Sequence, residues 1–146
     1  MRRLSRRQGR ERGSASIEAA IAVPAFALFV GLIIFGGRTT VAHQAVESAA
    51  VDAARSASLA RTSATAQSAA TTAATSSLAN QDVDCVKVSV EVDTHAFNAR
   101  VGQNAAVHVT VDCLLDLADL ALPGVPGSRT VQAKASSSLD TWRERS

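Results

Sequence analysis

The sequence predicts an α+β protein in which a long N-terminal transmembrane helix continues into an alanine-rich helix, followed by a small three-stranded antiparallel sheet. Residues 19–37 form an unbroken run of 19 uncharged, mostly apolar residues. Residues 38–79 are rich in Ala, Ser and Thr and contain no Pro or Gly. After residue 82, valines alternate with polar residues, which is the period of a half-buried strand. The change of period near residue 82 separates the helical half from the sheet.

Composition and charge limit what the protein can be. Apolar residues make up 47% of the 146 residues but aromatic residues only 3%, and much of the apolar fraction is alanine. Because alanine buries little surface, a large globular core over the whole length is not expected. The net charge is +2, and residues 1–12 contribute +5, so the remainder of the chain carries −3. A basic tail allows a nucleic-acid interpretation, but the adjacent apolar run favours a membrane-topology signal, so we expect no nucleic-acid partner.

The apolar run is long enough to cross a bilayer. At about 1.5 Å per residue, a helix over residues 19–37 is roughly 28 Å long, close to the thickness of the hydrocarbon core. A buried helix of a soluble protein is the alternative, but few other large side chains could cover it. Six arginines precede the run and Arg38 follows it, so we expect the N-terminus in the cytoplasm and the chain after Thr40 outside the membrane. Pro24 removes one backbone donor within this helix and is expected to kink it.

Four segments follow from these patterns: a basic cytoplasmic leader (1–13), the transmembrane helix (14–40), an Ala/Ser/Thr-rich helix and linker (41–81) and an extracytoplasmic β-rich region (82–146). We expect helix as far as about Leu59. From there to Leu78 no large apolar residue occurs, and the low complexity of this stretch leaves frayed helix and linker both open.

Two stretches after residue 82 have the period of strands. In VKVSVEV, residues 86–92, the four even-numbered valines, beginning with Val86, share one predicted inward face. In AVHVTVD, residues 106–112, the odd-numbered valines face inward. A turn containing Gly102 separates the two stretches, which predicts an antiparallel hairpin. A third, weaker strand is expected at Thr130–Ser137, and the alanine-rich helix is the available cover for the apolar face.

Cys85 opens the first predicted strand and Cys113 closes the second, so the hairpin brings them together. An extracytoplasmic location permits a disulfide, and closing the separation of 28 residues would stabilise the protein by roughly 3–4 kcal/mol. By strand alternation, however, Cys85 points outward and Cys113 inward, so their pairing requires a bulge or a bend. We favour the disulfide, with free buried thiols as the alternative. A zinc site that includes His95 and His108 is disfavoured because the spacing matches no compact ligand motif.

The sequence contains none of the motifs that mark common enzymes. We find no G-x-S-x-G, no phosphate-binding loop, no H-E-x-x-H and no dinucleotide-binding glycines. Asp93 and His95 lie two residues apart, a spacing that is common by chance. We therefore expect no catalytic residue, no metal and no cofactor.

One carboxylate stands at the edge of the apolar run, where an unpaired charge is costly. Glu18 follows Gly13 by five residues, between the basic leader and the apolar helix. This arrangement resembles the processing site of type IV prepilins. More closely, RGSASIEAAIAVPAFALFVGLIIFGG, with its Gly, Glu and Pro24, is similar to the TadE-like family of tight-adherence (Flp) pilus assembly proteins. The stretch AVDAARSASLA resembles the alanine-rich helix of that family, so the specific part of the resemblance covers residues 10–61.

The resemblance implies a pilin-like fold and a non-enzymatic role as a pseudopilin or minor pilin. It implies that a prepilin peptidase cuts after Gly13 and leaves Ser14 as the mature N-terminus. The implied partners are this peptidase, other pilins, an assembly ATPase and membrane platform proteins, together with the lipid bilayer. The implied location is the cell membrane, crossed once, and the extracellular pilus after processing. The chain departs from the family in its long Ser/Thr/Ala stretch and its lack of tyrosine.

Two other functions remain open. The first is a secreted binding domain released by signal peptidase after the apolar run. The second is an uncleaved single-pass membrane protein with a partner-binding extracytoplasmic region. The mass of the N-terminus distinguishes cleavage at the two places.

Removal of the leader would give Glu18 a partner. Cleavage after Gly13 creates an α-ammonium on Ser14, about one helical turn from Glu18. The ammonium of the same chain or of a neighbouring subunit could pair with the carboxylate, and the resemblance to pilins favours the neighbour. The alternative is that Glu18 only stabilises the N-terminal end of the helix.

Overall fold

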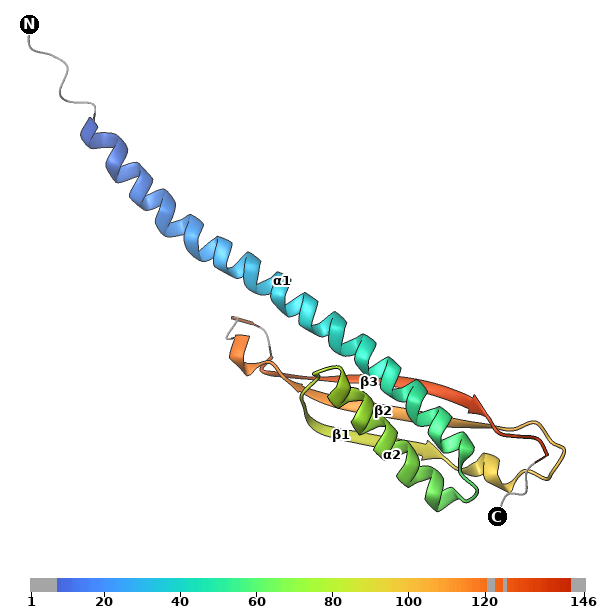
Figure 1. The fold of residues 1–146 in the computed structure, drawn as a ribbon. Coiled ribbons are helices and arrows are strands. Elements are labelled where there is room, and N and C mark those ends of the chain that lie inside the picture. The colour runs from blue at the N-terminus through green and yellow to red at the C-terminus, as the bar shows by residue number, and fades with distance from the viewer. Residues whose placement is uncertain (1–7, 121–122, 125, 143–146) are drawn as a thin grey trace, which may run out of the picture. The chain divides into compact units, whose positions relative to one another are not determined.

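A computed structural model describes residues 8–120, 123–124 and 126–142. Four of the six leader arginines, within residues 1–7, lie outside the described residues. The chain divides into two structural units, residues 1–37 and 38–146. The elements, labelled in Figure 1, are α1 (Gln8–Leu59), α2 (Ser63–Asn80), β1 (Cys85–Asp93), the 3-10 turn η1 (His95–Asn98), β2 (Ala106–Asp116), the 3-10 turn η2 (Ala118–Leu120) and β3 (Ser128–Ser138). The predicted α+β class, with helices before an antiparallel sheet, is confirmed.

Helix α1 has 52 residues and ends at Leu59, where the sequence predicted its end. Pro24 lies inside it. A proline at this position cannot donate to the carbonyl of the residue four earlier, and the kink expected there stays a prediction. After the helix, the Ala60 N–H donates to the Ala57 carbonyl at 3.1 Å, which closes the last turn.

Residues 63–80, for which the sequence left frayed helix and linker open, form helix α2. Thr62 is its N-cap: the Thr62 Oγ1 accepts the Thr65 N–H at 3.2 Å, and the Thr65 Oγ1 accepts the Thr62 N–H at 3.2 Å. This reciprocal capping box satisfies two backbone donors that the helix itself cannot use. Burial also stabilises α2. Its residues Ala66, Ala70 and Ala74, which are spaced by about one turn, are completely buried. Composition alone did not predict this helix, because Ser and Thr have lower helix propensities than Ala.

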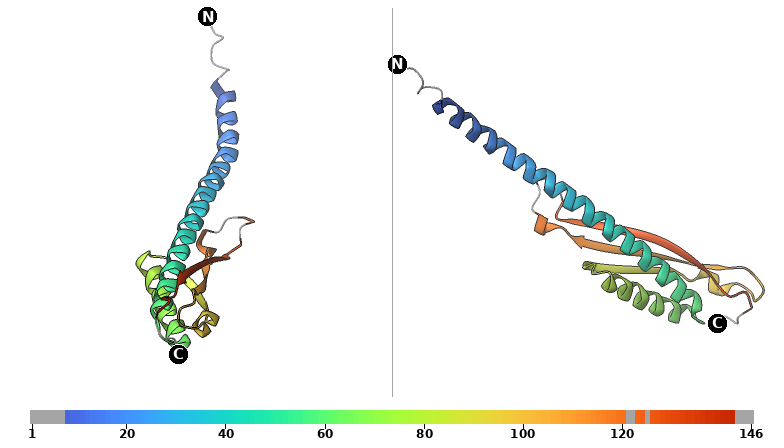
Figure 2. Two further views of the ribbon diagram at one scale, coloured as in Figure 1. Left: turned by 90° about the vertical axis from the view of Figure 1, so that its right-hand side faces the viewer. Right: turned by 45° about the horizontal axis from the view of Figure 1, so that its top comes forward.

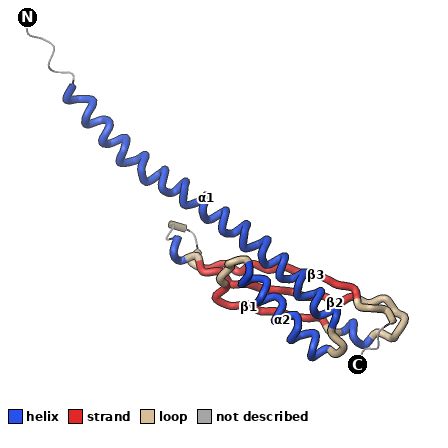
Figure 3. Tube along the Cα trace, viewed as in Figure 1, coloured by secondary structure: helices blue, strands red, loops and turns tan. Residues whose placement is uncertain are grey.

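The three strands form one antiparallel sheet in the order β1-β2-β3 (Figure 3). The odd-numbered valines of β2, Val107, Val109 and Val111, are 0–1% exposed, as the alternation predicted. The third strand, expected at Thr130–Ser137, is present as β3 and is slightly longer. In the connection between β1 and β2, Gly102 has a φ of +90°, a conformation that glycine adopts without a Cβ clash.

Strand β1 begins with a bulge that changes one prediction. Cys85 pairs with Leu115 and Lys87 pairs with Leu114, so Val86 is an extra residue without an opposite partner. Val86 is 66% exposed, and the prediction that it faces inward is wrong. The bulge reverses the alternation at this point, and so it places Cys85 on the covered face of the sheet.

The second structural unit, residues 38–146, has two layers. Within it, the C-terminal part of α1 and helix α2 cover the same face of the sheet (Figure 2, left). Val46 is the only large side chain among the buried residues that α1 contributes in the described chain; the others are Ala42, Ala45, Ala49, Ala50, Ala53, Ala54 and Ala57. Such small residues let a helix approach its neighbours closely. The larger apolar side chains of this core therefore come mainly from the sheet.

Candidate membrane and assembly segment

Among the described residues, one helix is long and apolar enough to cross a membrane: the part of α1 from Ser16 to Leu59. The mean hydropathy of its most apolar window of 18 residues is 2.5, and none of that window is buried within the protein. Ile21 and Phe26, for example, are 68% and 67% exposed. Contact between this apolar surface and water would be costly, whereas a bilayer matches it. The helix therefore fits a single-pass membrane anchor, and its length and composition also suit a signal sequence.

Helix α1 carries the three residues that the sequence singled out for processing and pairing. Gly13 and Ser14 lie in its second turn, and Glu18 lies one turn later, at the start of the apolar run. Ser14 and Glu18 are four residues apart, so they lie on the same side of the helix, about 6 Å apart along its axis. The Glu18 side chain is exposed. The helix thus brings the predicted new amino group and the carboxylate within one turn of each other.

Cys85 and Cys113 form a disulfide, with their Cα atoms 5.4 Å apart. The disulfide prediction is confirmed, and the alternative of free thiols is wrong. The parity conflict is resolved by the bulge at Val86, which turns Cys85 toward the face that carries Cys113. Both sulfurs are committed to this bond, so neither can serve as a thiolate ligand beside His95 or His108. Within the described part of the chain, no cluster of three or more His, Cys, Asp or Glu side chains could hold a metal.

Two polar contacts of the second unit escaped the sequence reasoning. The Arg38 Nη1 lies 2.6 Å from the Asp119 Oδ2, and these side chains are 52% and 59% exposed. The buried hydroxyl of Ser77 donates to the Asp52 Oδ2 at 2.7 Å, which connects α2 to α1. The partners are 81 and 25 residues apart in the sequence, so no local pattern could have revealed either contact. The ion pair between Arg38 and Asp119 lies just beyond the C-terminal end of β2.

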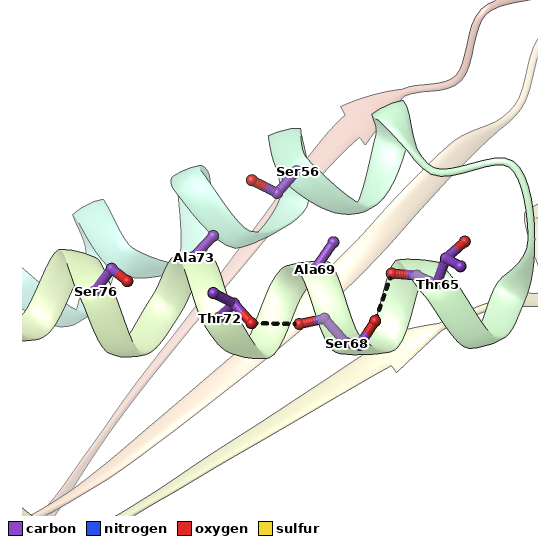
Figure 4. A pocket seen from close by; sticks show the side chains of 7 residues that line it. All are labelled: Ser56, Thr65, Ser68, Ala69, Thr72, Ala73 and Ser76. Carbon is purple, nitrogen blue, oxygen red and sulfur yellow. Dashed lines mark hydrogen bonds between the residues drawn. The ribbon is translucent and has the colours of Figure 1, made fainter.

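An open groove runs between α1 and α2 (Figure 4). Its lining consists of small side chains: Ser56, Thr65, Ser68, Ala69, Thr72, Ala73 and Ser76. The Ser68 Oγ donates to the Thr65 carbonyl at 3.1 Å, and the Thr72 Oγ1 donates to the Ser68 carbonyl at 3.0 Å. These hydroxyls therefore bond to the backbone of their own helix. The lining contains no carboxylate or imidazole that could activate a hydroxyl as a nucleophile.

Comparison with known proteins gives a match to the apolar N-terminal part of α1 and the alanine-rich part that follows it. The family model described as TadE-like protein matches residues 13–55. No curated protein and no solved structure matches the chain. The matched segment begins at Gly13, contains Glu18 and Pro24, and ends in the alanine-rich part of α1. Over residues 13–55, all of them within α1, the chain is similar to the TadE-like family.

Proposed function

We propose that this protein is a pseudopilin or minor pilin that acts without enzymatic activity in the assembly of a tight-adherence pilus. The observation that supports the proposal is the family match, which begins at Gly13 and includes Glu18 just before the exposed apolar run. TadE-like proteins are related to this pilus and are generally non-enzymatic. Their partners here would be other pilins and the membrane platform of the pilus.

The proposed topology has the N-terminus in the cytoplasm and residues 38–146 outside. The excess of arginines before the apolar run supports this orientation. The disulfide between Cys85 and Cys113 also supports it, because disulfides persist in oxidising compartments and are rare in the cytosol.

Processing would occur after Gly13, by a prepilin peptidase on the cytoplasmic side. Because α1 already includes residues 8–13, the peptidase must unwind the start of the helix before it can cut. Glycine favours this step, since it lowers helix stability by about 1 kcal/mol relative to alanine and carries no side chain that could hinder an active site. The cut removes all six leader arginines and with them the strongest anchor of the helix on the cytoplasmic side.

Glu18 would then pair with an α-ammonium of a mature N-terminus. Within one chain, the ammonium of Ser14 can approach it because the two residues lie on one side of α1. In an assembly, the ammonium of a neighbouring subunit can do the same and would connect two helices. A carboxylate in an apolar environment is costly without such a partner, so the pair would select correctly processed and correctly placed subunits.

Mass spectrometry of the protein extracted from membranes tests the cleavage. In cells that contain the peptidase, we expect a chain that begins at Ser14, and in cells without it the intact chain. An intact N-terminus in the presence of the peptidase would sink the processing proposal. A chain that begins after the apolar run would instead identify the signal-peptidase product.

Glu18→Ala tests the pairing separately from the cleavage. We expect this variant to be cut after Gly13 but to support little or no pilus formation. The matched control is Glu47→Ala, because Glu47 is another exposed glutamate of α1 and lies beyond the apolar run. Normal pilus numbers in the Glu18→Ala variant would rule out the pairing.

A further inference from the structure

One end of the second structural unit lies close to the residue where α1 leaves the apolar run. Arg38 directly follows this run in the chain and is the first residue of the second unit. Its Nη1 lies 2.6 Å from the Oδ2 of Asp119, in η2. Both partners belong to the second unit, so the bond places η2 next to Arg38 whatever the orientation of the membrane helix.

The chain around η2 contains little charge. Residues 117–127, LADLALPGVPG, connect β2 to β3 and include one charged residue, Asp119. Among the described residues of this connection, Ala118, Pro123 and Pro126 are exposed. We call η2 together with Pro123 and Pro126 the η2 end. Apart from the paired carboxylate of Asp119, these exposed side chains are small and apolar.

The polar groups at the base of this connection also have partners. The Asp116 Oδ1 accepts the Ala118 N–H at 2.9 Å. The Leu117 N–H donates to the Gly127 carbonyl at 2.8 Å, and the Leu117 side chain is buried. These bonds fix the start of η2 to the ends of β2 and β3. Both carboxylates of this region, on residues 116 and 119, are therefore engaged, so contact with lipid leaves no unpaired charge there.

We propose that the η2 end rests against the headgroup region of the bilayer and forms a second lipid contact beside the membrane helix. In the proposed function, the apolar run ends at the outer boundary of the hydrocarbon core. Arg38 then lies in the headgroup region, which is roughly 5–8 Å thick on each side of the bilayer. The ion pair brings Asp119 to the same region.

This contact is continuous with the lipid that surrounds the apolar run, so the bilayer is the surface that the η2 end meets first. Two points of contact limit the tilt of the second unit on its helix. The inference rests on the membrane anchoring in the proposed function but not on cleavage after Gly13.

The opposite end of the sheet supplies a natural reference. Strand β2 has 11 residues, so its two ends are about 33 Å apart. Beyond the end remote from η2, the Gly102 N–H donates to the Thr141 carbonyl at 2.8 Å, which places Trp142 there (Figure 1). Trp142 is the only tryptophan of the chain and is 82% exposed. We expect it to have no contact with lipid.

Quenching of tryptophan fluorescence by brominated lipid tests the contact. The full-length, uncut chain is placed in phosphatidylcholine nanodiscs, with or without bromine on the acyl carbons nearest the headgroups. In a Trp142→Phe background, Ala118→Trp and Pro123→Trp each put a single tryptophan in the η2 end. Because tryptophan at the headgroup level lies next to these carbons, we expect bromine to lower the emission of both variants at least twofold. The emission of Trp142 in the unmodified chain should not change.

Phe29→Trp, in the same background, is the control for anchoring, because Phe29 lies in the apolar run and is exposed. Quenching of Phe29→Trp without quenching of the two η2 variants would overturn the inference and leave the anchoring intact. No quenching of Phe29→Trp would overturn the anchoring as well. Equal quenching of Trp142 and the η2 variants would also overturn the inference, since lipid contact would not be confined to one end. Circular dichroism and the disulfide identify folded variants, and Pro123→Trp decides if Ala118→Trp does not fold.

Discussion

Loss of the disulfide should lower the free energy of unfolding by about 3–4 kcal/mol. The bond between Cys85 and Cys113 closes a separation of 28 residues. The chain-entropy model gives roughly 3.6 kcal/mol at 25 °C for a loop of this length. The loop includes β1 and most of β2, the strand that pairs with both others. Its closure therefore limits the unfolded chain in the part that forms the centre of the sheet.

The perturbation is the double replacement Cys85→Ala and Cys113→Ala. Alanine is preferable to serine because Cys113 is completely buried, and a serine hydroxyl there would lose its hydration. Urea unfolding of the full-length chain in detergent, followed by circular dichroism, measures the change. With a urea slope of about 1.5 kcal/mol per molar, the midpoint should fall by about 2.4 M. Fluorescence of Trp142 is a poor reporter because this side chain is 82% exposed in the folded protein.

Reduced protein with both cysteines intact is the control, and it should match the double variant. A loss below about 1 kcal/mol in both samples would refute the reasoning, because it would mean that closing the loop removes little entropy from the unfolded chain.

Deletion of Val86 tests whether formation of the disulfide depends on the bulge in β1. Val86 is the extra residue between Cys85 and Lys87, so its removal leaves Cys85 opposite Leu115 in a regular ladder. We expect the disulfide to persist, and a thiol assay on the unfolded, unreduced variant should detect no free thiol. Two free thiols would show that the bulge itself is needed to aim Cys85 at its partner.

Three further substitutions probe the helices. Ala50→Leu should lower the unfolding free energy by about 1–3 kcal/mol, because Ala50 is completely buried and overpacking forces the layers apart; Val51→Leu, at a position that is 57% exposed, should change it by less than about 0.5 kcal/mol. Thr62→Ala should cost about 1 kcal/mol through loss of the α2 capping box. Arg38→Ala should cost less than about 1 kcal/mol, since its ion pair is half exposed. Urea midpoints at unchanged slope measure all of these changes, and an Ala50→Leu variant as stable as the original would mean that the helix layer has room to spare.

The small buried residues of α1 lie in one part of the helix only. The part of α1 that follows the apolar run buries alanines such as Ala49 and Ala53 against its own domain. The apolar run itself has no buried residue in its most apolar window. The two parts of one helix thus differ: residues 42–57 are buried against protein, whereas residues 19–37 present an exposed apolar surface that fits a bilayer.

Several features could be predicted from the sequence because they depend on local composition and period. The uncharged run of residues 19–37, the end of α1 at Leu59 and the buried valines of β2 all follow from neighbours within a few residues. The spacing of Gly13 and Glu18 is also a local feature of the sequence. The resemblance to the TadE-like family was based partly on this spacing, and the family match confirmed that resemblance.

Tertiary structure alone decided the rest, because it depends on residues far apart in the chain. The helix at residues 63–80 packs against β1, and Ala70 within it is completely buried, so tertiary contacts stabilise it. The outward turn of Val86, and with it the inward turn of Cys85, needs the register between β1 and β2. A strand pattern shows which side chains alternate, but it does not show which edge a neighbour covers. The contact between the Gln67 Nε2 of α2 and the Val90 carbonyl of β1 therefore became visible only once the order of strands and the position of α2 were known.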